Sequence, residues 1–176
     1  MTQTQVVDDV ETLRSRTYSW SDPNATAAAV GRLSGIEMLR AMTRGELPPP
    51  PIMNTLEVTS FEVVAEGRAA FTMRAQEFHY NPIGSVHGGV ISTLLDSAAG
   101  CAVHSTLPAG WGYTSLDLTA KFLRPVTVDS GELRAEGTVI HRGRTTALAE
   151  ARLLDERGRL VAYASSSCVL FELPPR

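Results

Sequence analysis

The sequence predicts an α+β domain in which one long, apolar helix is wrapped by a single curved antiparallel sheet. From residue 89 to about residue 104, apolar residues recur at helical spacing around a single acid, Asp96. Six other segments, two before the helix and four after it, are bounded by turn residues and have the composition of strands. A helix that is apolar nearly all round must be covered on most sides, and a curved sheet does this economically. The expected order is β-β-α-β-β-β-β.

The composition is that of an ordinary soluble globular protein of one domain. The chain has 176 residues, of which 43% are hydrophobic and 20% are charged. Its net charge of -3 gives no basic field for nucleic acid, so any anion site must be local. The start lacks a secretory signal and no apolar run reaches membrane-spanning length, so we expect a cytoplasmic protein without a membrane partner. Cys101 and Cys168 are expected to be reduced, packed thiols.

The N-terminal part is expected to form an arm followed by a short helix. Residues 1–29 lack sustained periodicity, which predicts an extended or partly disordered arm. Ser34 and Glu37 form a capping box that begins a helix over residues 36–42. The four prolines at 48–51 are interpreted as a stiff spacer before the sheet.

The six strands are predicted from alternation and from the turns between them. Residues 113–122 alternate most clearly, with Leu116, Leu118, Ala120 and Phe122 on the apolar face and a polar face that should line a site or an interface. The segment 165–169 carries no charge, which favours sheet or edge pairing between protomers and therefore an oligomer. The expected strands are 54–64, 68–76, 113–122, 132–141, 145–154 and 159–171.

The helix begins in a glycine-rich loop that can stabilise a negatively charged oxygen. The free backbone N–H groups of Gly88, Gly89 and Val90 lie at the positive end of the helix dipole. Asp96 lies seven residues beyond Gly89, which is about 10 Å along the axis at roughly the same azimuth. It is too far to act on a carbonyl held at the start of its own helix. If Asp96 is catalytic, the loop and the acid must come from different copies of the chain, as two antiparallel helices across a two-fold axis would permit.

Each residue of this region also has a structural interpretation. Asp96 could cap a neighbouring loop or pair with a basic residue. The imidazole of His87 fits a role in fixing the loop by hydrogen bonding better than a role in proton transfer. Asn81 could close an Asx turn, or its amide could donate to a substrate carbonyl. Ser115 is a plain strand serine unless the fold brings it into a site.

Other chemistries lack their sequence patterns. The serine in the segment 84–88 is in the wrong position for a G-x-S-x-G nucleophile elbow. The sequence has no H-E-x-x-H motif and no cysteine cluster, so no metal site is expected. The remaining histidines, His79, His104 and His141, are interpreted as ordinary partly buried or surface residues.

Basic residues gather at two predicted turns, one before Pro125 and one around Gly143. They are Lys121, Arg124, Arg142 and Arg144. If the sheet brings the two turns together, they form a local phosphate site on an otherwise acidic protein. If it does not, they are solvated surface charges.

The loop and helix resemble the signature of a known enzyme family. The pattern N-x-x-G-x-x-H-G-G-x6-D, from Asn81 to Asp96, matches in spacing the motif of hotdog-fold acyl-CoA thioesterases, specifically the phenylacetic-acid-degradation (PaaI-like) subgroup. The resemblance extends over residues 47–171. It predicts a hotdog thioesterase domain at 47–173, preceded by the arm and short helix at 1–46.

The resemblance implies a homodimer with a continuous sheet and shared active sites, commonly assembled further into a homotetramer. The Gly88 N–H and the Asn81 side chain would polarise the thioester carbonyl. Asp96 of the partner subunit would attack it or activate water, which Ser115 would help to orient. Coenzyme A would leave as a thiol, so no retained cofactor is implied. The implied substrate-binding residues are His87, Gly89, Lys121, Arg124, Arg142, Gly143 and Arg144.

The first functional hypothesis is therefore hydrolysis of an acyl- or aryl-acyl-CoA thioester. A thiolate departs readily near neutral pH, so one carboxylate and an oxyanion hole are a sufficient set of groups. One alternative is a hotdog-fold enoyl-thioester hydratase or dehydratase, which needs a histidine and an acid together, whereas His87 and Asp96 are nine residues apart. The other alternative is a non-catalytic acyl-CoA binding module. The sequence does not identify the acyl group.

Overall fold

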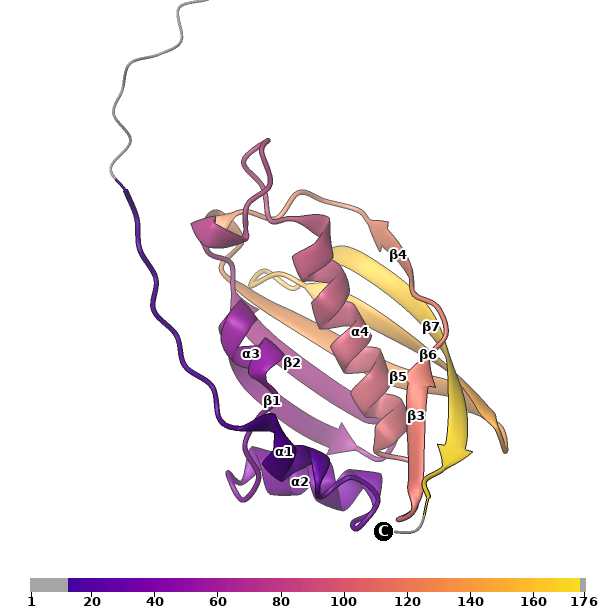
Figure 1. The fold of residues 1–176 in the computed structure, drawn as a ribbon. Helices are drawn as coiled ribbons and strands as arrows, with labels where there is room; N and C mark the ends of the chain where they lie inside the picture. The colour runs from indigo at the N-terminus through magenta and orange to yellow at the C-terminus, as the bar shows by residue number, and fades with distance from the viewer. Residues whose placement is uncertain (1–12, 175–176) are drawn as a thin grey trace, which may run out of the picture.

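A seven-stranded antiparallel sheet curves around one long helix in the computed structural model, which describes residues 13–174 (Figure 1). The helix is α4 (Gly88–His104). The strand order is β1-β2-β5-β6-β7-β3, and β4 also pairs with β7. The predicted α+β fold class is confirmed. The strands are β1 (Val58–Ala65), β2 (Arg68–Arg74), β3 (Trp111–Ser115), β4 (Thr119–Phe122), β5 (Glu132–Arg142), β6 (Thr146–Leu154) and β7 (Leu160–Glu172).

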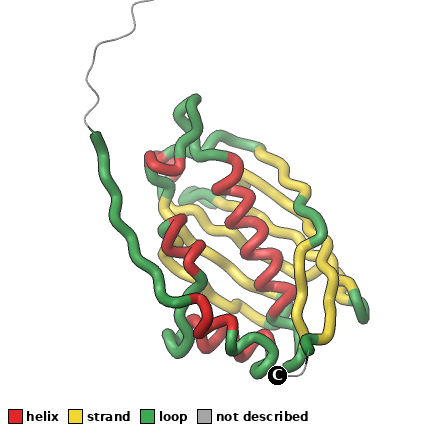
Figure 2. Tube along the Cα trace, in the orientation of Figure 1, coloured by secondary structure: helices red, strands yellow, loops and turns green. Residues whose placement is uncertain are grey.

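α4 lies against one face of the sheet and forms the centre of the core (Figure 2). Its closest approach is at Gly137 of β5, where a Cβ atom would stand 2.0 Å from the carbonyl oxygen of Ala98. Only glycine lets the two backbones come so close. Leu94, Leu95 and Val103 of α4 are almost fully buried among the side chains of the central strands. The helix therefore has a fixed position on the sheet, which also fixes its two ends.

A short helix near the N-terminus covers the C-terminal end of α4. This helix, α2 (Gly35–Thr43), begins with the predicted capping box: the Ser34 hydroxyl accepts from the Glu37 N–H, and the Glu37 carboxylate accepts from the Ser34 N–H at 3.1 Å. The capping box is confirmed. A Cβ atom at Gly35 would stand 1.7 Å from the carbonyl oxygen of His104, so the start of α2 packs directly on the end of α4.

Two predictions for the N-terminal part are wrong. α1 (Pro23–Ala27) lies in the segment expected to be an arm without regular structure. α3 (Pro51–Leu56) contains the last proline of the expected spacer and the first residues of the expected strand 54–64. Proline favours the first turn of a helix, and Glu57, which is left-handed with φ of 57°, ends that helix before β1. Residues 1–12 of the expected arm lie outside the described residues.

The single strand predicted over 113–122 is divided into β3 and β4 at Asp117. The Asp117 carboxylate accepts from the Ser167 N–H at 3.0 Å, and its backbone carbonyl accepts from the Ser166 hydroxyl at 2.8 Å. A side chain thus occupies the place of a ladder hydrogen bond, which interrupts the alternation. Leu116, placed by the alternation on the apolar face, is 63% exposed. The sheet has seven strands instead of six for this reason.

The uncharged segment 165–169 lies inside the sheet and not at its edge. It belongs to β7, which pairs with β6 on one side and with β3 and β4 on the other. Edge pairing between protomers, one of the two modes expected for this segment, is therefore wrong, because its backbone groups already have partners. Sheet pairing between protomers stays a prediction. The outer strands are β1 at one end of the sheet and β3 with β4 at the other.

Candidate active site

The start of α4 is organised by His87, which caps the helix. The Nδ1 atom of His87 accepts a hydrogen bond from the Gly89 N–H at 2.8 Å, and its carbonyl accepts from the Val90 N–H at 3.0 Å. His87 therefore fixes this loop, as its structural interpretation required, and Nδ1 carries no proton in this arrangement. Of the three N–H groups expected to stabilise an oxyanion, only that of Gly88 has no acceptor within residues 13–174. The helix dipole at this end still favours a negative charge.

Asn81 closes the loop that precedes this helix. Its side-chain oxygen accepts from the N–H groups of Ile83 and Ser85, at 3.0 and 3.2 Å, which forms the Asx turn predicted as one of its two roles. Its amide nitrogen donates to the Ser85 hydroxyl at 3.0 Å. An amide nitrogen carries two N–H groups, so one has no acceptor among the described residues. The turn and a second donor role are thus compatible.

Asp96 and Ser115 meet where β3 runs beside α4. The Ser115 hydroxyl donates to the Asp96 carboxylate at 3.0 Å, although the residues are nineteen apart in sequence. Both side chains are half-buried, and Asp96 makes no ion pair with any described residue. They line an open groove of about 370 Å³. The remaining groove residues are Ser92, Thr93, Leu116, Asp117 and Leu118.

The two candidate catalytic ends of α4 are far apart in one chain. Gly88 and Asp96 are separated by eight residues, about 12 Å along the helix axis. Phe122 of β4 covers Gly88, because a Cβ atom there would stand 3.2 Å from the aromatic ring. This contact was not predicted, since the alternation assigned Phe122 to the apolar face of a continuous strand. Because the strand is interrupted at Asp117, the Phe122 ring does not keep the orientation that a continuous alternation would give it.

The two basic turns are not brought together in one chain. Lys121 is opposite Tyr163 on β7, whereas Arg142 is opposite Ala147 on β6, which in turn is opposite Cys168 on β7. Five residues along β7 correspond to about 17 Å, and three strand spacings add about 14 Å across the sheet. A single phosphate therefore cannot contact both turns of the same subunit. All four basic side chains, Lys121, Arg124, Arg142 and Arg144, are exposed.

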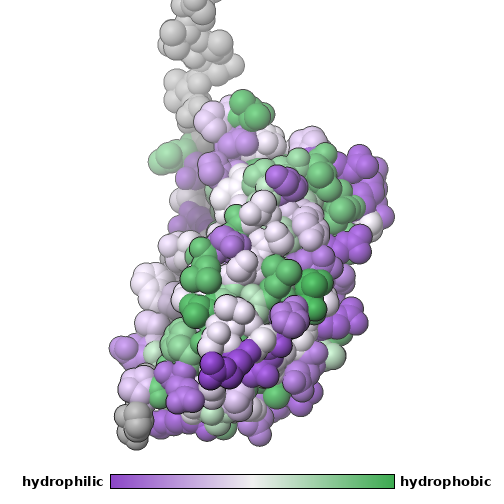
Figure 3. All heavy atoms as spheres, turned by 90° about the vertical axis from the view of Figure 1, so that its right-hand side faces the viewer, coloured by the Kyte–Doolittle hydropathy of each residue, from purple (hydrophilic) through white to green (hydrophobic). Residues whose placement is uncertain are grey.

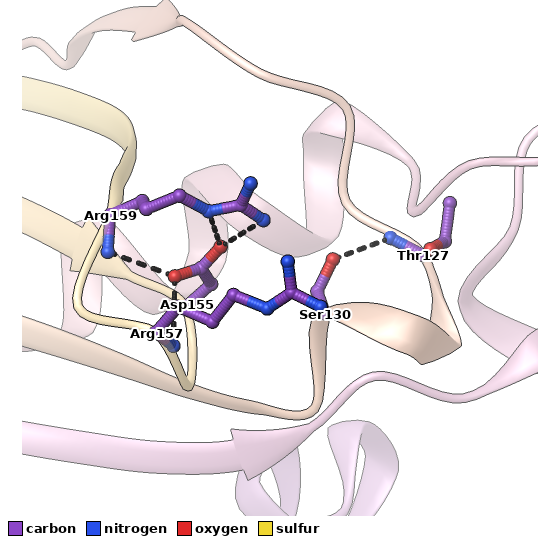
Figure 4. Close-up of polar contacts among 5 residues, drawn as sticks. All are labelled: Thr127, Ser130, Asp155, Arg157 and Arg159. Atoms are coloured by element: carbon purple, nitrogen blue, oxygen red, sulfur yellow. Dashed lines mark hydrogen bonds and ion pairs between the residues drawn. The ribbon is translucent and has the colours of Figure 1, made fainter.

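A second aspartate, Asp155, is buried, and its carboxylate accepts all its hydrogen bonds from its own turn (Figure 4). One carboxylate oxygen accepts from the N–H groups of Arg157 and Arg159, at 3.1 and 2.9 Å, and the other accepts from the Arg159 guanidinium at 2.7 Å. These hydrogen bonds, led by that of the Arg159 side chain, hold the pKa of Asp155 below its usual range. The Glu156 N–H donates to the Ser130 carbonyl at 3.2 Å, which ties this turn to the neighbouring one. Asp155 is therefore a structural acid.

Within residues 13–174, no cluster of three or more His, Cys, Asp or Glu side chains could hold a metal ion. In the same part of the chain, no helix is long and apolar enough to cross a membrane.

Comparison with known proteins agrees with the fold and the motif. The Thioesterase superfamily profile matches residues 83–162. A solved structure of a phenylacetic acid degradation-related protein from Ralstonia eutropha, named as a thioesterase, is 32% identical with a TM-score of 0.68, over 74% of this chain and 98% of that one. The chain belongs to the thioesterase superfamily. It is thus a thioester hydrolase with the hotdog fold, and the family resemblance predicted from the motif is confirmed.

Two further relatives show how far the similarity extends in sequence. Acyl-coenzyme A thioesterase 13 of Mus musculus is 26% identical over 70% of this chain and 88% of its own. A Halobacterium salinarum protein named as an esterase is 41% identical over 69 residues, which are 38% of this chain and 44% of that protein. The stronger identity is thus local, and the weaker identity spans most of the domain.

Proposed function

We propose that this protein hydrolyses an acyl- or aryl-acyl-CoA thioester, with Asp96 as the nucleophile or general base. The observation that carries the proposal is the carboxylate of Asp96, which is held by Ser115 in an open groove and has no cation beside it among residues 13–174. A carboxylate with unused lone pairs can attack a carbonyl or take a proton from water. The name of the mouse relative supports coenzyme A as the leaving group.

In the proposed reaction, the Gly88 N–H and the free amide N–H of Asn81 donate to the thioester oxygen. Attack on the carbonyl carbon by the carboxylate, or by water that has given its proton to the carboxylate, forms an oxyanion at this position. Collapse of the intermediate breaks the carbon–sulfur bond and releases coenzyme A as a thiolate, a good leaving group near neutral pH. If water attacks, the free acid forms in this step. If the carboxylate attacks, the acyl group remains on Asp96 as a mixed anhydride, which water then hydrolyses to the free acid and the restored carboxylate. Ser115 orients the carboxylate by its hydrogen bond.

Two copies of the chain are needed for this chemistry. About 12 Å of helix separates Gly88 from Asp96, so a carbonyl bound at Gly88 requires Asp96 of the partner subunit. The side of the domain formed by β3 and β4 is the natural place for the contact, because its surface includes broad apolar areas (Figure 3). Leu116, Phe122 and Leu123 on this side are all more than half exposed. A homodimer, or a homotetramer of two such dimers, would cover them.

The basic turns are proposed to hold the phosphates of coenzyme A. Because the two turns of one subunit are far apart, Lys121 and Arg124 would act with Arg142 and Arg144 of the partner subunit, or each pair would bind a different phosphate. His87, Gly89 and Gly143 would shape the backbone near the substrate. Degradation of a phenylacetic acid derivative is one setting for this activity, supported by the name of the Ralstonia protein.

The decisive experiment is a thiol-release assay on aryl, short-chain and long-chain acyl-CoAs. Wild-type protein should release free thiol from at least one class, and Asp96→Asn should lower kcat by about 10²–10⁴-fold while the oligomer persists. An enoyl-CoA included in the panel distinguishes hydratase activity, which removes the double bond and leaves the thioester. Near-normal turnover by Asp96→Asn would sink the assignment.

Subunit mixing tests whether the site is shared. Gly88→Pro removes the N–H donor and adds a ring beside Phe122, at a first helical position where proline is accepted; Gly88→Ala is the control that adds a Cβ atom but keeps the donor. Each of Asp96→Asn and Gly88→Pro should be inactive alone. Co-expressed hybrids of the two, purified through different tags, should regain about half the wild-type activity, because one of two sites is then intact. Hybrids without activity would show that both residues serve one site in one chain.

A further inference from the structure

We propose that the cavity between the N-terminal helices and the C-terminal half of α4 binds an uncharged, mainly apolar ligand that presents a hydroxyl group. The cavity has a volume of about 340 Å³. α1, α2 and the residues that follow them form one side, and α4, β3 and β7 form the other. It is lined by Thr26, Val30, Met38, Leu39, Met42, Pro50, Cys101, His104, Gly112, Tyr113, Phe171 and Leu173.

The buried imidazole of His104 is the feature that indicates a ligand. It is 9% exposed, and neither of its ring nitrogens has a hydrogen-bond partner within the described residues. Its ring lies beside that of Tyr113, with 5.7 Å between the ring centroids. A buried imidazole without partners is costly, so such groups in native proteins usually have a partner, which can be a bound molecule. His104 is one of the residues that line the cavity, but both of its ring nitrogens have almost no solvent-accessible area, so the ring must turn for a ligand in the cavity to bond to them.

The chemistry of the lining restricts the ligand to uncharged molecules. Burial lowers the pKa of His104, raises that of Tyr113 and raises that of Cys101 to about 12, with a smaller effect of Asp96 on both acids. These side chains are therefore neutral near pH 7. The lining contains no lysine, arginine, aspartate or glutamate that could pair with a charged ligand. A neutral imidazole offers one donor and one acceptor, which together complement a hydroxyl group.

The rest of the lining is apolar and suits an aromatic ring or the end of an acyl chain. Met38, Leu39 and Met42 of α2 face Phe171 and Leu173 across the cavity. The volume is at the small end of the range for small-molecule sites. Because α1 and α2 supply one whole side, the N-terminal helices would complete this site.

The position of the cavity allows two sources for such a ligand. Tyr113 packs over Gly100, one helical turn beyond Asp96, where a Cβ atom would stand 2.5 Å from the tyrosine oxygen. His104 lies eight residues beyond Asp96, about 12 Å along α4. The hydroxyl could thus end the acyl chain of a substrate bound at Asp96, or belong to a separate small molecule. Only the first source rests on the proposed function.

Phenol is the probe for the site itself, with toluene as the probe that lacks the hydroxyl. Titration calorimetry should show that His104→Leu weakens phenol binding by about tenfold and leaves toluene binding unchanged. His104→Gln, which keeps one donor and one acceptor, should retain most of the affinity for phenol. Equal phenol binding by His104→Leu and wild type would overturn the proposal. The proposal would also be overturned if the wild-type protein bound neither probe. A Tm of His104→Leu above that of the wild type would then indicate that His104 is only an unsatisfied buried histidine.

Matched acyl-CoA substrates identify the source. If the hydroxyl belongs to the substrate, kcat/KM should favour 8-hydroxyoctanoyl-CoA over octanoyl-CoA in wild type and in His104→Gln, and His104→Leu should lose this preference. If the ligand is separate, there should be no preference, and phenol should still bind in the presence of saturating octanoyl-CoA. A chain that binds phenol through His104 but hydrolyses no acyl-CoA would refute the proposed function and leave this site supported.

Discussion

Asp155 and Asp96 are two aspartates of one domain with opposite surroundings. The Asp155 carboxylate accepts from two backbone N–H groups and from the Arg159 guanidinium. The Asp96 carboxylate accepts from the Ser115 hydroxyl and faces an open groove. The acceptor positions of the Asp155 carboxylate are occupied by donors from its own turn. The Asp96 carboxylate, on α4, accepts from a donor on β3 and keeps unused lone pairs. The presence of an acid thus says little about its role until its donors are known.

Two matched variants test this contrast, because one should lose activity and the other should lose stability. Asp96→Asn should lower kcat by about 10²–10⁴-fold with little change in Tm, since the groove remains open to water. Asp155→Asn should leave kcat within about twofold and lower Tm by roughly 2–4 °C, because the turn loses its charged acceptor. Parallel thiol-release assays and thermal melts measure both. A similar loss of kcat in the two variants would abolish the distinction.

Ser115→Ala tests whether the one donor of Asp96 matters to its role. Removal of a hydrogen bond to a carboxylate should lower kcat by about tenfold, with a smaller effect on KM. Ser60→Ala on β1 is the control, because Ser60 is exposed and lies at the far end of the sheet. If both variants have wild-type kcat, Ser115 does not position the catalytic carboxylate.

The pH dependence of stability tests the saturated acid. The pKa of Asp155 is lowered in the folded chain, mainly by the Arg159 side chain. Its contribution to stability is therefore fully present above the unfolded pKa of about 3.9 and is lost as pH falls through the folded pKa. The difference in Tm between wild type and Asp155→Asn should be constant from pH 7 to about 5 and shrink below about pH 4. A difference that does not shrink at all between pH 5 and pH 3 would contradict the ionised pair.

The sequence was sufficient for the features that depend on local pattern. The helix, its glycine-rich start and the capping box at Ser34 all follow from residues close together in the chain. The rise of the helix per residue also indicated that the start of the helix is too far from Asp96 for both to act on one carbonyl in one chain, which led to the shared-site hypothesis. The roles of the site residues, the domain boundary after residue 46 and the cytoplasmic location stay predictions.

The features that were missed depend on contacts between distant segments. The interruption at Asp117 needs the backbone of Ser167, and the covering of Gly88 needs the ring of Phe122. The separation of the basic turns needs the strand order, which alternation does not specify. The imidazole of His104, which has no hydrogen-bond partner within residues 13–174, could not be anticipated either, because α2, far from it in sequence, packs on the end of α4 at this residue.

The close contact at Gly137 also has a mechanical consequence for the proposed dimer. Because the backbone of α4 is held against β5 at Ala98, the helix cannot slide along its axis without moving the sheet. One end of α4 would serve one catalytic centre, and its middle would serve the other. The distance between these two parts of α4 is therefore fixed within each subunit, and the helix, not the bound substrate, would set the spacing of the two centres.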